Sequence, residues 1–366
     1  MRIGIEAERA NTDHPTGVEH YAQQVILALA AMDQDNSYIL YLRTPARQWM
    51  KNLPKNFSTK VMPFPIFWTQ LRISWEMLFN SPDALFIPAS ALPIFHPRNS
   101  VVTIHDIAWK FFPETFSLGM RWYLKLSTWF AVHFAKAVIT VSNQTRSDVL
   151  KAYNANPTKI VAVHLGFDAE AEEREMAGSI PSAEENLKIS KLPEKFVLYL
   201  GTLQPRKNII GLINAFEILQ KENKLKGTKL VIAGGKGWLY HQIIDRIESN
   251  PEIIYFGYVQ NRFGLIKRAS LLVQPAFYEG FGLQLLDAFW AGVPVACSNI
   301  SSLPEVAANA AEYFDPHSEQ SIANAISTVL NNPHRAQELV QAGEIRLKDF
   351  SWKQTAQETL RILCQK

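Results

Sequence analysis

The chain has 366 residues, roughly twice the length of a typical single domain, so we expect two domains. Hydrophobic residues make up 47% and charged residues 19% of it, a balance typical of a globular protein that buries a sizeable core. The formal net charge of +3 is far from the strongly basic composition of a dedicated nucleic-acid-binding protein, so nucleic acid is not an expected partner.

The N-terminal sequence MRIGIEAERA carries charges at Glu6, Glu8 and Arg9, which interrupt any apolar run of signal-peptide length. No later segment approaches the ~18 to 20 apolar residues that a membrane-spanning helix needs. Cys297 and Cys364 have no metal-ligand spacing, and a chain with two distant cysteines suits a reducing compartment. These features predict a cytoplasmic protein.

Short apolar runs alternate with longer amphipathic segments along residues 1–167. Helices are predicted over Val18–Met32 and Arg121–Ala135 because apolar side chains recur there at helical spacing. Strands are predicted at Ile3–Ile5, Tyr38–Leu42, Ala84–Ile87, Val101–Ile104, Ala137–Val141 and Ile160–Val163. This alternation predicts a first α/β domain with a doubly wound sheet.

Residues 168–194 carry eight acidic and three basic residues with little apolar periodicity, which predicts a linker or a flexible insertion. The alternation then resumes and predicts a second α/β domain over residues 195–349. Its strands are expected at Phe196–Leu200, Lys229–Ala233, Ile253–Phe256, Leu271–Val273 and Val293–Cys297. Two helices are expected from Pro333 onward, interrupted at Phe350–Trp352, and residues 350–366 form a separate C-terminal segment.

In α/β domains, ligands usually bind beyond the carboxyl ends of the strands. The first such motif is GTLQPRKN, residues 201–208, where Asn208 is a candidate N-cap. Arg206 and Lys207 would project near a helix N-terminus, an arrangement suited to phosphate. The alternative is that both are solvated loop cations.

Two motifs follow strands in the first domain. Gly17, at the start of a predicted helix, would let backbone N–H groups approach a phosphate. His105 ends a central strand and is a candidate ligand contact or a structural histidine.

The turn Val231–Trp238 lacks the GxGxxG spacing of a dinucleotide fingerprint and is read as a tight turn. The missing fingerprint argues against an NAD-dependent enzyme.

The segment YEGFGLQLLDAFWAGVPV, residues 278–295, places two carboxylates in an apolar stretch. Glu279 precedes a predicted helix and Asp287 lies near its second turn, so both can face one ligand. Gly280 and Gly282 flank Phe281 and permit close backbone approach at the helix N-terminus. The alternative is that Glu279 caps the helix and Asp287 faces water.

These motifs, together with TIHD, GYV at residues 257–259 and FSW at residues 350–352, resemble the retaining GT-B glycosyltransferases of family 4 over nearly the whole chain. Within that family, TGVEHY and GTLQPRKN are most similar to the mannosyltransferase-like enzymes of bacterial polysaccharide assembly. The resemblance implies two Rossmann-like domains facing each other across a deep cleft. It also implies that residues 350–366 cross back to the first domain.

The resemblance further implies roles for the second domain. Arg206 and Lys207 would hold the donor diphosphate, and Glu279 would contact hydroxyls of the transferred sugar. Asp287 stands where the family usually has a glutamate on the nucleotide ribose, and is one methylene shorter. Backbone N–H groups would meet sugar or phosphate oxygens at Phe281, Gly282 and Leu283, with Gly280 beside them.

Other residues match less central parts of the family pattern. His105 would lie near the donor sugar and Gly17 near the diphosphate, whereas Tyr258 and Val259 match the loop beside the base. Thr202 stands where many members carry an arginine, which removes one cation from the leaving group. No residue has the character of a covalent nucleophile, and neither a metal nor a cofactor is expected.

The implied reaction transfers a hexose, GDP-mannose being the first candidate donor, onto a glycan or lipid-linked acceptor in cell-surface polysaccharide synthesis. UDP-, dTDP- and ADP-sugars remain alternatives, as does a catalytically inactive nucleotide-sugar binder. The acceptor is expected on the first domain. Aromatic and basic residues at 107–136 and at Pro63–Trp75 suggest peripheral contact with a membrane, although aromatic helices are more often part of a core.

Overall fold

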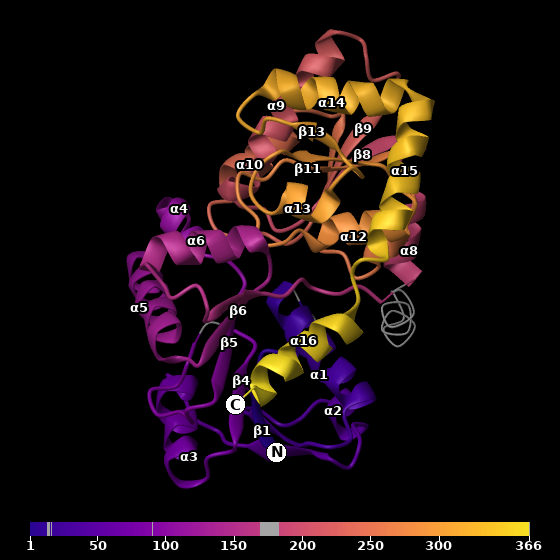
Figure 1. Ribbon diagram of the computed structural model, residues 1–366. Helices are drawn as coiled ribbons and strands as arrows, with labels where there is room; N and C mark the ends of the chain where they lie inside the picture. The colour runs from indigo at the N-terminus through magenta and orange to yellow at the C-terminus, as the bar shows by residue number, and fades with distance from the viewer. Residues whose placement is uncertain (13–14, 16, 90, 169–182, 366) are drawn as a thin grey trace. The chain divides into compact units, whose positions relative to one another are not determined.

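A computed structural model describes residues 1–12, 15, 17–89, 91–168 and 183–365 (Figure 1). The chain forms two compact units. Unit 1 comprises Met1–Phe111, Ser117–Gly166 and Phe350–Lys366, and unit 2 comprises Phe112–Phe116 and Phe167–Asp349. Across the described residues, no helix is both long and apolar enough to cross a membrane.

Unit 1 is built on a seven-stranded parallel sheet in the order β3-β2-β1-β4-β5-β6-β7. The strands are β1 (Arg2–Glu6), β2 (Ser37–Leu42), β3 (Phe57–Val61), β4 (Ala84–Ile87), β5 (Ser100–Ile104), β6 (Ala137–Thr140) and β7 (Ile160–Ala162). Every residue of β4 and β5 is buried, as expected for central strands covered on both faces. Strand β3 was not predicted, because it is a largely exposed edge strand with the unpatterned sequence FSTKV.

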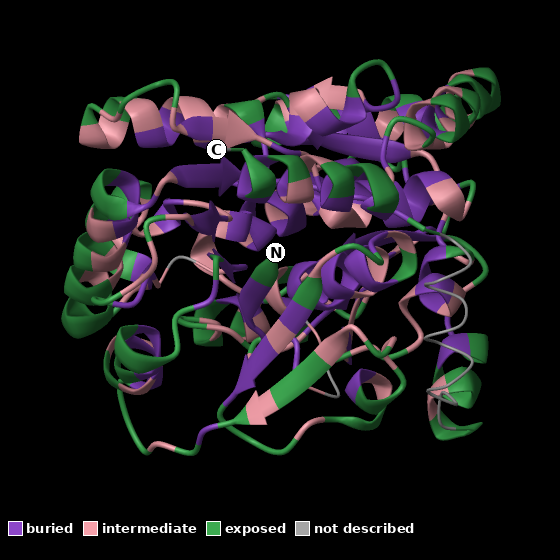
Figure 2. Cartoon of the chain, turned by 60° about the horizontal axis from the view of Figure 1, so that its bottom comes forward, coloured by how far each residue is buried: buried purple, intermediate pink, exposed green. Residues whose placement is uncertain are grey.

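Helices cover the sheet of unit 1, and Figure 2 shows buried strands beneath helices with exposed outer faces. The helices are α1 (Gly17–Met32), α2 (Gln48–Lys51), the π-helix η1 (Thr69–Ile73), α3 (Ser74–Phe79), α4 (Ala108–Phe111), α5 (Leu118–Phe134), α6 (Asn143–Tyr153) and α16 (Trp352–Cys364). Ser117 and Ser142 cap α5 and α6 by accepting a backbone N–H in the first turn.

Helix α16 packs on unit 1 although it follows unit 2 in sequence, and it lies beside α1 (Figure 1). The Trp352 ring lies 5.7 Å from the His20 ring. Thr355 Oγ1 donates to the carbonyl of His164 over 2.8 Å, and Asn99 Nδ2 donates to the carbonyl of Leu363 over 2.7 Å. Both ends of α16 are therefore fixed to unit 1 by hydrogen bonds.

Unit 2 contains a six-stranded parallel sheet in the order β10-β9-β8-β11-β12-β13. Its strands are β8 (Phe196–Leu200), β9 (Lys229–Ala233), β10 (Ile253–Gly257), β11 (Leu271–Gln274), β12 (Val295–Ser298) and β13 (Glu312–Phe314). The three-residue edge strand β13 was not predicted, since so short a segment has no readable period. The central strand β8 is flanked by β9 and β11, which places the loops after these strands at one edge of the sheet.

Unit 2 also contains α-helices and 3-10 helices. They are the 3-10 helices η2 (Pro113–Thr115) and η3 (Pro205–Lys207), with α8 (Ala183–Ser190), α9 (Ile209–Lys221), α10 (His241–Glu248), α11 (Arg262–Ile266), α12 (Leu283–Trp290), α13 (Leu303–Ala307), α14 (Glu319–Asn331) and α15 (Pro333–Leu347). Leu212 and Phe216 of α9 and Ile322 and Ile326 of α14 are buried in one core cluster of this unit.

Helix α8 lies inside the range predicted as a linker. Its Ile189 is buried, and the carboxylate of Glu185 accepts the backbone N–H of Gln260 over 2.8 Å. Arg268 donates to the carbonyls of Ile189 and Leu192. The acidic composition of this range hid the helical pattern of α8. Residues 169–182 of the same range lie outside the described part of the chain.

The loops after β8 and β9 approach each other closely. Leu203 and Lys236 form an isolated parallel bridge. Gly234 has φ +140°, and a Cβ atom there would overlap the carbonyl group of Gly201. Backbone packing therefore requires glycine at position 234, which agrees with the prediction of a tight turn.

Candidate active site

The loops that follow β8 and β11 are joined by hydrogen bonds at the edge of the sheet of unit 2. The backbone N–H of Phe277 donates to the carbonyl of Arg206 over 2.9 Å. The Arg206 guanidinium in turn donates to the carbonyl of Tyr278 over 2.9 Å and to Gln204 Oε1 over 3.2 Å. Residues 72 positions apart in the sequence are thus held in one fixed arrangement.

Two cations and one carboxylate meet at this junction. Lys207 Nζ donates to Glu279 Oε1 in a direct ion pair, and Arg206 Nη1 lies 3.7 Å from Glu279 Oε2. Gln274 Nε2 also donates to Glu279 Oε1 over 2.9 Å. The structure therefore brings together Arg206, Lys207 and Glu279, and it adds Gln274, whose position at the end of a predicted strand was the only sequence signal.

The backbone of Glu279 is fixed from the loop after β12. Ser301 Oγ accepts the Glu279 N–H over 3.0 Å and lies 2.7 Å from its carbonyl oxygen, to which Ser302 Oγ also donates over 2.9 Å. Neither serine was predicted, because a serine pair in a loop has no distinctive spacing. With this support Glu279 presents its carboxylate beside the two cations and does not act as a helix cap.

Helix α12 starts directly after the Glu279 loop. Gly282 occupies the N-cap position with φ +107°, and a Cβ atom there would lie 2.7 Å from Leu303 Cδ2. Only glycine fits both the backbone angle and the space. The first N–H groups of α12, at Leu283 and Gln284, are not bonded within the helix and can face an anion, whereas the N–H of Leu285 donates to the carbonyl of Gly282 over 3.0 Å. Gly280 and Phe281 are buried in the turn that precedes them.

Asp287 lies in α12, nearly buried, with its Oδ2 atom 3.4 Å from Arg262 Nε at the start of α11. Asp287 is therefore paired with a cation and is not a solvated side chain. Arg262 was not among the predicted site residues. Tyr258 and Val259 lie just before α11, in the loop after β10, and Tyr258 is exposed. An aromatic ring, a cation and a carboxylate thus come from neighbouring elements, a set that can contact a base and a ribose.

The pKa of Tyr199 is affected by the charge at the centre of the site. This residue is fully buried, and its hydroxyl donates to the carbonyl of Thr202 over 3.3 Å. Burial and then the carboxylate of Glu279 raise the pKa of Tyr199 well above its ordinary value. The phenol of Tyr199 therefore stays protonated and remains uncharged beside the charged groups.

Asn208 was expected to cap α9 but does not do so through its side chain. Its backbone is left-handed, with φ 55°, and Nδ2 donates to the carbonyl of Pro316 over 2.8 Å. The 3-10 turn η3 ends at this residue, and its side chain lies against Gly211 in the first turn of α9 without capping the helix. Through this hydrogen bond, Asn208 connects the Arg206–Lys207 loop to the segment before α14.

His105 and Gly17 belong to unit 1. The Nε2–H group of His105 donates to the carbonyl of Pro88 over 2.8 Å, and its ring packs edge-on against Tyr21 with centroids 4.9 Å apart. Burial lowers the pKa of His105, although the bond to Pro88 acts in the opposite direction. The neutral imidazole then keeps a lone pair on Nδ1 that can accept a hydrogen bond. Gly17 is exposed at the first position of α1.

Comparison with known proteins identifies the family of the chain. Residues 15–171 match Glycosyltransferase Family 4, and residues 182–346 match Glycosyl transferases group 1. O-antigen chain mannosyltransferase B of Escherichia coli is 32% identical over 72% of this chain and 69% of its own length.

Two solved structures show the same fold. Sucrose-phosphate synthase from Thermosynechococcus elongatus aligns with a TM-score of 0.75 at 18% identity, over 99% of this chain and 98% of its own. Anabaena HepE in complex with UDP-glucose aligns with a TM-score of 0.70 at 16% identity, over 99% of both chains.

The predicted GT-B fold is confirmed by the two parallel sheets of unit 1 and unit 2 and by these whole-chain alignments. Both family matches and a relative above 30% identity point to the same enzyme class. The chain therefore belongs to glycosyltransferase family 4, the group 1 glycosyl transferases, and is a hexosyltransferase.

Proposed function

We propose that this enzyme transfers mannose from GDP-mannose, with retention, onto a glycan or lipid-linked acceptor during synthesis of a cell-surface polysaccharide. Its similarity to an O-antigen chain mannosyltransferase supports mannose as the sugar. UDP-, dTDP- and ADP-sugars are the alternatives, since the similar Anabaena protein was solved with UDP-glucose. A nucleotide-sugar binder without activity is a further alternative, because Asp287 and Thr202 depart from the family pattern.

The ion cluster of Arg206, Lys207 and Glu279 carries the proposal. Two cations held against one carboxylate leave a net positive charge in a nearly buried position, which is what a diphosphate requires. Glu279, fixed by Ser301 and Ser302, accepts hydrogen bonds from hydroxyls of the donor sugar. The N–H groups of Phe281, Gly282 and Leu283 meet oxygens of the same ligand.

The proposed chemistry follows from the movement of charge. The bond between the anomeric carbon and the diphosphate oxygen breaks, which leaves positive character on the sugar ring and negative charge on the departing oxygen. Arg206 and Lys207 stabilise that charge electrostatically. The acceptor hydroxyl forms the new bond on the same face and gives its proton to the departing phosphate.

The remaining predicted residues hold the ends of the donor. Asp287, oriented by Arg262, binds the ribose, while Tyr258 and Val259 border the base. His105 accepts a hydrogen bond from the donor sugar at its Nδ1 lone pair, and Gly17 gives backbone access to the diphosphate. Neither a metal ion nor a cofactor has a part in this scheme.

A peripheral position at the inner face of the cytoplasmic membrane is part of the proposal. Apolar side chains of unit 1 are exposed on α3 and α5, among them Trp75, Phe79, Trp122 and Trp129. Lys125 Nζ lies 5.0 Å from the Trp122 ring centroid, so a cation lies beside an exposed aromatic ring on α5. Such a surface suits an interface with anionic lipids and would hold the enzyme near a lipid-linked acceptor.

A thermal-shift screen against GDP-, UDP-, dTDP- and ADP-sugars tests the donor, because a ligand selective for the folded state raises Tm. GDP-mannose should give the largest shift, and Lys207→Ala should abolish it. Slow release of GDP from GDP-mannose separates an enzyme from an inactive binder. A shift with NAD, and none with any nucleotide sugar, would refute the transferase.

A further inference from the structure

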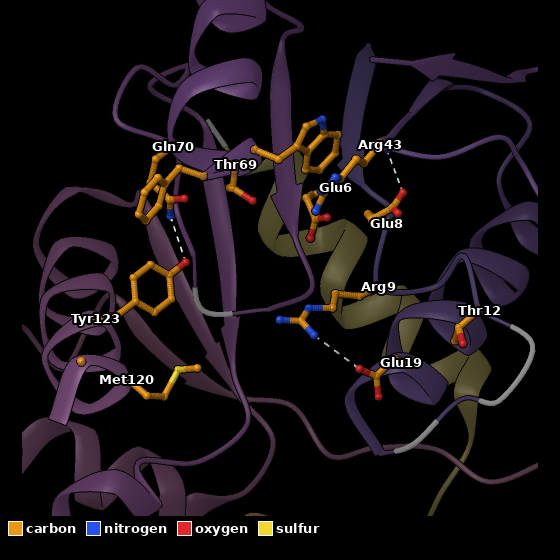
Figure 3. Close-up of a pocket in the computed structure, with 13 residues that line it drawn as sticks. Glu6, Glu8, Arg9, Thr12, Glu19, Arg43, Thr69, Gln70, Met120 and Tyr123 are labelled. Atoms are coloured by element: carbon orange, nitrogen blue, oxygen red, sulfur yellow. Dashed lines mark hydrogen bonds and ion pairs between the residues drawn. The ribbon is translucent and has the colours of Figure 1, made fainter. Parts of the chain in front are cut away.

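Unit 1 contains a cavity of about 790 Å³ that the sequence did not reveal (Figure 3). We call it the β1 cavity because Glu6, the last residue of β1, lines it together with Arg9 from the following loop. Its volume falls within the ~300–1,000 Å³ of small-molecule sites. The opposite wall comes from η1 and α5, where Gln70 and Tyr123 lie across the space from Arg9 (Figure 3).

Aromatic and apolar side chains form part of the β1 cavity. Trp68 donates its indole N–H to the carbonyl of Met62 over 2.7 Å, which leaves the ring itself as a flat apolar wall. Tyr123 accepts a hydrogen bond from Gln70 over 3.1 Å, so its own hydroxyl proton is available to a ligand. The C–H face of a pyranose packs well on such rings, while its hydroxyls reach the polar groups.

The backbone around this wall departs from regular geometry. Phe67, which also lines the cavity, has φ 50°, a left-handed conformation that is costly for a bulky side chain. It lies two residues before the π-helix η1, whose residues Thr69 and Gln70 line the cavity. Strained residues and π-helices both occur preferentially at binding sites.

The charges of the β1 cavity are largely matched. Glu8 accepts the backbone N–H groups of Arg43 and Thr44 over 2.8 and 3.2 Å, which uses its carboxylate for structure. Arg9 Nη1 lies 3.5 Å from Glu19 Oε1. Glu6 is only 5% exposed, and burial raises its pKa to about 7, against the opposing effect of Arg9. Near neutral pH its carboxyl group therefore both accepts and donates hydrogen bonds.

We propose that the β1 cavity binds an uncharged sugar residue of the acceptor glycan, with Glu6 and Arg9 hydrogen-bonded to its hydroxyl groups. The inference rests on the proposed function, because a transferase needs a second saccharide site for the acceptor. The described lining residues hold three carboxyl groups (Glu6, Glu8 and Glu19) and two guanidinium groups (Arg9 and Arg43), which disfavours a phosphorylated or acidic sugar. The combination of aromatic walls with carboxyl and guanidinium groups suits a neutral polyol.

The test measures binding of α-1,2-mannobiose to the intact protein at pH 8 by saturation-transfer NMR and titration. Glu6→Gln and Arg9→Gln should each raise the Kd for mannobiose at least about tenfold, because each removes a charged hydrogen-bonding group. Glu358→Gln, a matched change on the outer face of α16, should leave that Kd unaltered. Equal mannobiose affinity in the wild type and both cavity variants would overturn the proposal, as would tighter binding of mannose 6-phosphate or glucuronate.

Titration of GDP-mannose in the same samples separates this inference from the proposed function. The GDP-mannose Kd should stay within about twofold in the cavity variants, since neither Glu6 nor Arg9 is among the residues proposed for the donor, most of which lie in unit 2. A wild-type protein that binds no nucleotide sugar refutes the transferase. A wild type that binds GDP-mannose but not mannobiose refutes only the β1 cavity as an acceptor site.

Discussion

Lys207 and Glu279 form an ion pair between two strand-end loops, and neither side chain is more than 9% exposed. Withdrawing both charges from water costs several kcal/mol, so such a pair is weak evidence for stability. The arrangement is better explained by binding of a diphosphate. The negative charge of the diphosphate would pair with Lys207 and Arg206 in place of part of their interaction with Glu279.

Replacing either cation should slow the reaction, while the other cation still lies beside the carboxylate of Glu279 and limits the effect on the fold. Lys207→Ala and Arg206→Ala should each lower kcat for sugar transfer by about 10²–10³, the loss expected when one preorganised group on a departing anion is removed. Steady-state kinetics on protein with unaltered circular dichroism measures this loss. Lys224→Ala, an exposed lysine of the same unit, is the control, and a Lys207→Ala enzyme as fast as that control would contradict the assignment.

Gly282 should be sensitive to the smallest side chain. Alanine there combines a left-handed backbone with a Cβ atom 2.7 Å from Leu303, so Gly282→Ala should cost roughly 1–3 kcal/mol of unfolding free energy. Urea denaturation compares it with Gly235→Ala, where an added Cβ atom meets no other atom within 4 Å. If both variants unfold at the same urea concentration, the turn before α12 is less constrained than its geometry indicates.

His105 should remain uncharged at pH values where an exposed histidine is half protonated. Burial lowers its pKa, so protonation occurs only at more acidic pH, and stability linked to the neutral ring is present above the ordinary pKa and lost as pH falls. Nitrogen-15 NMR should show the proton on Nε2 at pH 7. A proton on Nδ1 would contradict the hydrogen bond to Pro88 and the acceptor role of Nδ1.

Glu6 should make stability depend on pH in the opposite direction. Its pKa rises from 4.5 to about 7 on folding, so the stability of the protonated form is complete below pH 4.5 and lost as pH rises to 7. That shift corresponds to about 3 kcal/mol, because one pKa unit is about 1.4 kcal/mol. Glutamine does not titrate and avoids the cost of a buried charge.

Glu6→Gln should consequently raise Tm at pH 8 and have little effect on it at pH 4.5. Thermal unfolding at both pH values, with Glu358→Gln as the control, measures the difference. A variant that gains stability while losing mannobiose affinity would identify Glu6 as a residue retained for binding. A Tm at pH 8 below that of the wild type would instead show that the carboxylate stabilises the fold.

Most of the fold could be predicted from the sequence because buried parallel strands are mostly apolar and alternate with amphipathic helices. Edge strands β3 and β13 were not predicted, since β3 is largely exposed and β13 is very short. Helix α8 was obscured by its acidic composition. In each case tertiary packing, rather than local pattern, decides the structure.

The candidate site was predictable to the extent that its residues follow strands. Arg206, Lys207 and Glu279 meet because parallel strands end at one edge of a sheet. The partners Arg262, Ser301 and Ser302 come from elements whose spacing along the chain has no set value. Glu6 and Arg9 were visible only as charges near the N-terminus, because the wall opposite them is built by η1 and α5.

The return of α16 to unit 1 has a consequence for biosynthesis. Trp352, Thr355 and Leu363 supply contacts to α1 and to the segments around His164 and Asn99, so unit 1 is incomplete while residues 350–366 are still being translated. Unit 2 has its own sheet and core and can mature on the ribosome first. Unit 1 would then expose apolar surface that chaperones can bind until α16 emerges from the ribosome.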